Sequence, residues 1–166
     1  MNAIDLLLLQ FDHNWNHRWE SIQSALKNTT PAAALFQATC YAKEKKEADA
    51  PSPGTILWQL FHMHWCNLHY ANVLRLRPQK EIADPPKPPI MTLDQTIAAL
   101  QQSHQALRSE VAKLKESDLD DPCNSTGQSV AEFVSACVRH EVWHASQVAV
   151  ARRLFREAEP TPAAEK

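Results

Sequence analysis

The sequence predicts an all-α protein, a four-helix bundle with one long crossover connection. Apolar residues recur at intervals of three and four along four long segments, which is the spacing of amphipathic helices. The chain has only two glycines, Gly54 and Gly127, so it has few residues suited to the positive-φ turns of β-hairpins. Its prolines cluster at 51–53, 85–89 and 160–162, between the periodic segments. Long helices separated in this way are expected to pack side by side as a bundle.

The first predicted helix covers residues 3–27. Its inner face carries eight apolar residues: Ile4, Leu7, Leu8, Phe11, Trp15, Trp19, Ile22 and Leu26. Residues 28–30 (NTT) end this helix and can cap a short helix that begins at Pro31.

Two further long helices follow. The second, over residues 55–76, is apolar on nearly all sides, so we expect it to be the most enclosed helix of the bundle. A Pro-rich segment, residues 78–89, then forms the long crossover. The third helix is capped by Thr92, runs to about Lys115, and includes His104 in its inner stripe.

The fourth helix begins at a capping box formed by Ser129 and Glu132, and we predict that it ends near Arg156. A chain of 166 residues fits one domain. We therefore predict a single helical domain over residues 1–157 and a flexible C-terminal tail over residues 158–166.

Composition excludes several classes of function. The net charge of −2, with charges of both signs interspersed, offers no basic surface for nucleic acid. The apolar run Leu6–Leu9 is too short for a signal peptide or a membrane span, so we expect a cytoplasmic protein that does not bind membranes. Neither glycine pattern of the Rossmann and P-loop nucleotide sites occurs. The four cysteines lack close spacing and are expected to be reduced thiols: Cys40, Cys66, Cys123 and Cys137.

A pair of histidines on the fourth helix predicts a metal site. His140 and His144 are four residues apart, which places both imidazoles on one face of a helix, where two nitrogens can bind one ion. The same face carries an inward stripe that continues in both directions: Phe133, Cys137, Gln147, Ala151 and Leu154. Buried imidazoles need partners, and a divalent cation satisfies two of them together.

Two other interpretations of this pair stay open. The letters also spell His-Glu-x-x-His, the zinc metalloprotease signature, in which Glu141 would be the general base. That class takes a third ligand from a later element, and here only Glu157, Glu159 and Glu165 follow. Glu141 lies about 100° around the helix from His140, so it either reaches a metal-bound water or points toward a neighbouring helix. In the other interpretation, backbone carbonyls and water satisfy both histidines.

A third ligand is expected from a facing helix, and the second helix offers His62, His64 and His69. His62 and His64 lie about 200° apart around the helix axis, so at most one of them faces the pair. Periodicity alone does not choose between them.

Three segments resemble the DinB-like (damage-inducible) metal-binding four-helix bundles, which include the bacillithiol and mycothiol S-transferase relatives. Residues 11–16 (FDHNWN) are similar to the opening helix of that family, residues 55–63 (TILWQLFHM) to its Trp-x-Leu-x-His run, and residues 140–148 (HEVWHASQV) to its His-x-x-x-His-x-Gly-Gln-Ile run. Ser146 replaces the glycine of the last motif. The resemblance implies three metal ligands: His62, His140 and His144.

Three imidazoles leave Zn²⁺ or Ni²⁺ with open coordination positions, as in a catalytic site. The resemblance implies a metal-dependent transferase that uses a low-molecular-weight thiol to attack a small electrophile. The alternative is a non-enzymatic metal-binding bundle in a stress response. We expect Cys66 to pack in the core, with a role as a soft fourth ligand as the alternative. Most tryptophans are expected in the core as well: Trp15, Trp58, Trp65 and Trp143.

Members of that family often pair through helix faces, so the resemblance also implies a homodimer. The first helix carries more apolar surface, Leu6–Leu9 with Phe11, than one inner stripe uses.

Overall fold

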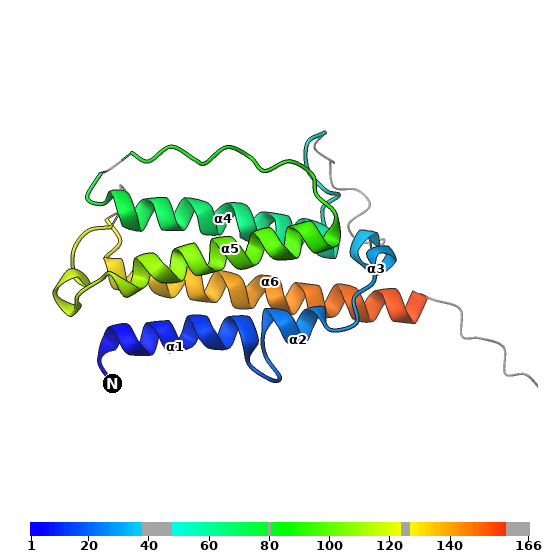
Figure 1. The fold of residues 1–166 in the computed structure, drawn as a ribbon, viewed down its shortest axis with the longest axis horizontal. Helices are drawn as coiled ribbons and strands as arrows, with labels where there is room; N and C mark the ends of the chain where they lie inside the picture. The colour runs from blue at the N-terminus through cyan, green and yellow to red at the C-terminus, as the bar shows by residue number, and fades with distance from the viewer. Residues whose placement is uncertain (38–47, 80, 124–126, 159–166) are drawn as a thin grey trace, which may run out of the picture.

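The computed structural model describes residues 1–37, 48–79, 81–123 and 127–158 (Figure 1). These residues form six α-helices and one 3-10 turn, and their only β pairing is an isolated bridge between Pro122 and Ser129. The predicted all-α class is therefore confirmed. Of the predicted tail, residues 158–166, only Ala158 lies within the described residues, as the last residue of a helix.

Four helices lie side by side along the length of the molecule: α1 (Ala3–Asn16), α4 (Ile56–Leu76), α5 (Leu93–Ala112) and α6 (Val130–Ala158). Figure 1 shows that α1 and α6 run in one direction and that α4 and α5 run in the other. Helices α4 and α5 are parallel because residues 81–92 return along the whole bundle before α5 begins. The predicted long crossover is therefore present. Among the described residues, no helix is long and apolar enough to cross a membrane.

Side-chain caps fix where the long helices begin. The Thr55 hydroxyl accepts a hydrogen bond from the Trp58 backbone N–H at 3.0 Å and starts α4. Thr92 does the same for α5, where its hydroxyl accepts from the N–H of Gln95 at 3.3 Å. At α6, Ser129 donates its backbone N–H to the Glu132 carboxylate at 2.9 Å, as the capping box predicts.

The prediction of one continuous helix over residues 3–27 is wrong. Helix α1 ends at Asn16, and a separate short helix, α2 (Ile22–Leu26), follows. The Ser21 side chain accepts from the backbone of Ser24, a local bond that competes with helix continuation. Trp19, expected on the inner face, lies in the connection and is 71% exposed. The short helix predicted at Pro31 is present as α3 (Pro31–Leu35), capped by Thr30.

The bundle has two apolar core clusters, one toward each end. The first includes Phe11, Leu74, Leu107 and Val134, and the second includes Trp15, Met63, Leu100 and Val148. On each long helix a buried polar residue falls between the two clusters: Asn14 on α1, Asn67 on α4, His104 on α5 and Glu141 on α6. The middle of the bundle therefore contains a polar layer, and the predicted histidine site lies at this level of α4 and α6.

Candidate metal centre

The structure brings together the three histidines that the sequence singled out. His62 comes from α4, and His140 and His144 come from α6. The His62 ring centroid lies 5.3 Å from that of His140 and 4.9 Å from that of His144, and the last two are 4.4 Å apart. The Nε2 atoms of His140 and His144 approach to 3.0 Å. The imidazoles therefore form one compact cluster between two facing helices.

Neighbouring side chains hold these rings in place. The Nδ1–H of His144 donates to the side-chain amide oxygen of Gln59. This bond leaves the Nε2 lone pair of His144 free to bind an ion. Trp58 stacks on the His62 ring at 4.9 Å with an interplanar angle of 4°. Such partners fix ligand orientation before an ion arrives.

A fourth donor atom lies at the edge of the cluster. The Cys66 sulfur is 3.5 Å from the His62 Nε2 atom, and one ligand atom each of Cys66, His62 and His140 lie within 4.8 Å of one another. We expected Cys66 to pack in the core, but its side chain is only half-buried and lies beside His62. A His/Cys/His cluster of this size is compatible with a divalent metal ion.

Burial keeps the imidazoles neutral. It lowers the pKa of His62 and brings the pKa of His140 to about 4 and that of His144 to about 3. Metal ligation requires the unprotonated imidazole, so all three rings are ready to bind at neutral pH without first losing a proton.

We predict that the metal-free protein loses stability as the pH falls below about 6.5. In the unfolded chain His140 and His144 take up protons near their ordinary pKa of 6.5, whereas in the folded chain they resist protonation down to about pH 4 and 3. The stabilising contribution is therefore complete above the unfolded pKa and is lost as the pH falls toward the folded values. Urea unfolding with chelator at pH 7, 6 and 5 measures it. In a His140→Gln/His144→Gln variant the fall with pH should be smaller, and an equal fall would contradict the assignment.

His64 points away from the cluster. It is half-buried and hydrogen-bonds the backbone of Ala99, which belongs to α5. Periodicity left His62 and His64 as alternatives, and the structure places only His62 beside the pair on α6.

Glu141 also points away from the cluster, into the polar layer of the bundle. It is fully buried, and its carboxylate contacts the Nδ1 atom of His104 at 2.8 Å and accepts from Asn67 at 2.9 Å and Asn14 at 3.4 Å. A general base has to reach the proton that it removes. Of the two orientations that the sequence allowed, Glu141 therefore takes the one toward neighbouring helices. In this orientation the Glu141 carboxylate does not face the histidine cluster, so the geometry does not support a role as the general base of a protease.

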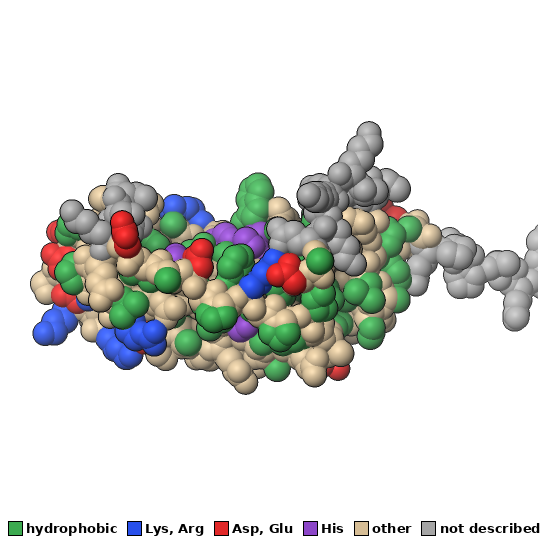
Figure 2. Space-filling view, turned by 90° about the horizontal axis from the view of Figure 1, so that it is seen from above, with side chains coloured by type: hydrophobic (Ala, Val, Ile, Leu, Met, Phe, Trp, Pro, Cys, Tyr) green, Lys and Arg blue, Asp and Glu red, His purple; other side chains and the backbone are tan. Residues whose placement is uncertain are grey.

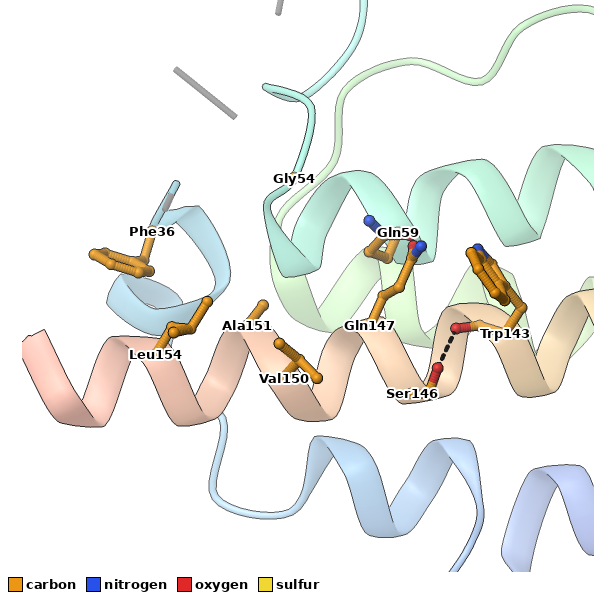
Figure 3. Close-up of a pocket in the computed structure, with 9 residues that line it drawn as sticks. All are labelled: Phe36, Gly54, Gln59, Trp143, Ser146, Gln147, Val150, Ala151 and Leu154. Atoms are coloured by element: carbon orange, nitrogen blue, oxygen red, sulfur yellow. Dashed lines mark hydrogen bonds between the residues drawn. The ribbon is translucent and has the colours of Figure 1, made fainter. Parts of the chain in front are cut away.

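A pocket of about 260 Å³ is lined by residues of α3, α4 and α6 (Figure 3). Gln59, the hydrogen-bond partner of His144, lines its inner end together with Gln147. Its other walls are largely apolar and include Phe36 and Trp143. The prediction that Trp143 belongs to the core is wrong, because this side chain is 64% exposed and forms a wall of the pocket.

The centre is accessible from solvent. His62 and His140 are half-buried, and Figure 2 shows histidine side chains reaching the surface on the face that it presents. His144 is buried, at the inner side of the cluster. A small molecule can therefore reach the half-buried imidazoles of His62 and His140.

Sequence comparison agrees with the fold. The family model described as the DinB superfamily matches residues 14–148, which include all three histidines. No curated protein and no solved structure matches the chain.

Proposed function

Because this chain belongs to the DinB superfamily and carries an accessible cluster of neutral imidazoles beside a pocket, we propose that it is a metal-dependent transferase. It would join a low-molecular-weight thiol to a small electrophile. The observation that carries the proposal is the convergence of His62, His140 and His144 between two facing helices.

The residues present fit a divalent ion such as Zn²⁺ or Ni²⁺. Two Nε2 atoms at 3.0 Å with a third imidazole beside them, all neutral, form a donor set typical of these ions. A bound ion would supply positive charge that lowers the pKa of a thiol at the centre.

The remaining residues have positioning roles. Gln59 holds His144 in the tautomer that presents Nε2, and Trp58 fixes the plane of the His62 ring. The pocket beyond Gln59, with apolar walls at Trp143 and Phe36, would take the apolar part of the electrophile.

A conjugation assay tests the proposal. Purified protein loaded with Zn²⁺ or Ni²⁺ is mixed with monobromobimane and, in turn, cysteine, glutathione, bacillithiol or mycothiol. We expect one thiol to react faster than without protein, and the excess rate to disappear with chelator and return with metal. A rate equal to the spontaneous one for every thiol would overturn the transferase proposal.

A non-enzymatic metal-binding bundle in a stress response is the second candidate. The position of Cys66 beside His62 favours it, because a fourth protein ligand is typical of closed, structural zinc sites. The same assay separates the two candidates, since a structural ion would bind without accelerating conjugation.

We also propose a homodimer formed through α1. Leu6 and Leu9 on this helix are 49% and 37% exposed, whereas Phe11 is fully buried and contributes no surface. Burial of exposed apolar side chains favours association. Light scattering at micromolar concentration should give about twice the monomer mass of 18.8 kDa, and Leu6→Glu/Leu9→Glu should restore the monomer mass. A wild-type mass of 18.8 kDa would contradict the dimer.

A further inference from the structure

Cys66 occupies a position that three imidazoles alone would leave open. It follows His62 by one helical turn on α4, so both side chains project from the same face. Its sulfur is 3.5 Å from His62 Nε2 and lies within 4.8 Å of a His140 nitrogen, and His140 Nε2 is in turn 3.0 Å from His144 Nε2. Cys66, His62 and His140 therefore form one group of candidate ligand atoms from two helices, and His144 joins it through the Nε2 atom of His140.

Two of the separations between these atoms are close to those of a tetrahedral site. With Zn–N bonds of about 2.0 Å and a Zn–S bond of about 2.3 Å, ligand atoms at tetrahedral angles lie roughly 3.3 Å (N to N) and roughly 3.5 Å (N to S) apart. The observed values are 3.0 Å between the two Nε2 atoms and 3.5 Å between His62 and Cys66. A hydrogen bond between the Cys66 thiol and the His62 imidazole would by itself explain the distance of 3.5 Å between them. It would not explain why the imidazoles of His140 and His144 lie beside this pair.

Tyr70 contacts both the Cys66 sulfur and the His140 ring. It lies one turn beyond Cys66 on α4, and its hydroxyl forms a hydrogen bond with the sulfur. The Tyr70 ring also packs edge-on against His140, at 5.6 Å and 81°. A donor to the ligand sulfur and a ring against a second ligand are the kind of surroundings that orient metal ligands.

We propose that Cys66 is the fourth ligand of the ion, bound as a thiolate, and that it occupies the coordination position that a small-molecule thiol requires. Coordination releases the proton of Cys66 to solvent. In the resting protein the chain itself then closes the site, and an external thiol competes with Cys66. The inference rests on the metal site of the proposed function but not on transferase activity.

Cobalt spectroscopy tests this assignment. Metal-free wild-type protein is titrated with Co²⁺, and the near-ultraviolet band of thiolate-to-cobalt charge transfer is recorded together with the visible bands. We expect one Co²⁺ per chain with a thiolate band in the wild type, and Co²⁺ binding without that band in Cys66→Ala and Cys66→Ser. Cys123→Ser is the matched control, because Cys123 is buried in the first core cluster and not at the centre, and it should keep the band.

A thiol titration tests the shared position. Added 2-mercaptoethanol should restore a thiolate band in cobalt-loaded Cys66→Ser, because its sulfur enters the vacated position. If the band does not return at any concentration that leaves Co²⁺ bound, the shared position is overturned.

A measurement on the wild type alone covers the case in which the variants fail to fold. Zn²⁺ should protect Cys66 from iodoacetamide, and chelator should expose it, as located by peptide mass mapping. Bound Co²⁺ without a thiolate band in the wild type, or alkylation of Cys66 at the same rate with and without Zn²⁺, would overturn the inference. Absence of Co²⁺ binding would overturn it together with the metal site, whereas a thiolate band without conjugation activity would overturn only the transferase.

Discussion

Replacing His144 with alanine should abolish binding of the divalent ion, and His140→Ala should do the same. Both residues present Nε2 to one point, and His144 is held there by Gln59. Loss of a residue that only hydrogen-bonds a ligand typically costs about 10- to 100-fold in affinity, so Gln59→Leu should fall in that range and the two alanine variants beyond it. Elemental analysis of purified protein and Zn²⁺ titration calorimetry measure the effect.

His64→Ala is the matched control for His62→Ala. Both residues are half-buried histidines on α4, but His64 bonds the backbone of Ala99, and His62 lies beside His140 and His144. We expect His62→Ala to lose the ion and His64→Ala to keep it. The reverse result would assign the third ligand to His64 and contradict the geometry.

Most of the fold could be predicted because its signals are local. The caps at Thr55, Thr92 and Ser129 and the spacing of apolar residues define where α4, α5 and α6 begin, within a residue or two. The break after Asn16 could not be predicted in this way, because apolar spacing continues through it and only the serines near Ser21 mark the interruption.

The site was predictable where it depends on one helix and ambiguous where it depends on two. The spacing of His140 and His144 defines a shared face by itself. The choice of His62 over His64 depends on how α4 is rotated about its axis, and α4 is too apolar on all sides for hydropathy to show this rotation.

Gln59 was missed and Cys66 was given only as an alternative ligand, although the spacing of both gave a signal. Gln59 and Cys66 lie three residues before and four residues after His62, so they share its face of α4. Once His62 is taken as a ligand, these are the positions on its own helix to inspect first. Trp143 gave no such signal, because an aromatic residue next to a buried stripe is normally part of the core.

The sequence left the orientation of Glu141 open for a different reason. Its neighbours in the sequence, His140 and His144, associate it with the metal site, but its actual partners come from three other helices. The carboxylate joins α6 to Asn14, Asn67 and His104 in the polar layer between the two apolar clusters. This network fixes the rotation of α6 that turns His140 and His144 toward α4.

We expect Glu141→Ala to lower the free energy of unfolding by about 1–3 kcal/mol for each buried polar group that it leaves without a partner. The truncation leaves the Nδ1 atom of His104 and the Asn67 amide without their acceptor inside the bundle, whereas the Asn14 amide keeps its hydrogen bond to the Val138 carbonyl at 3.0 Å. Urea unfolding with chelator present measures the loss without any contribution from bound metal.

Glu157→Ala is the matched control, because it removes the same side chain from the same helix. Glu157 pairs with Arg153 at 2.7 Å on the exposed surface, where such an interaction contributes less than about 1 kcal/mol. The loss of unfolding free energy in Glu141→Gln should lie between those of the two alanine variants. Its amide oxygen still accepts one hydrogen bond, but its NH₂ group lies against other donors and cannot accept from them. If Glu141→Ala costs no more than Glu157→Ala, the polar layer does not hold the helices together, and the orientation of His140 and His144 must then depend on apolar packing alone.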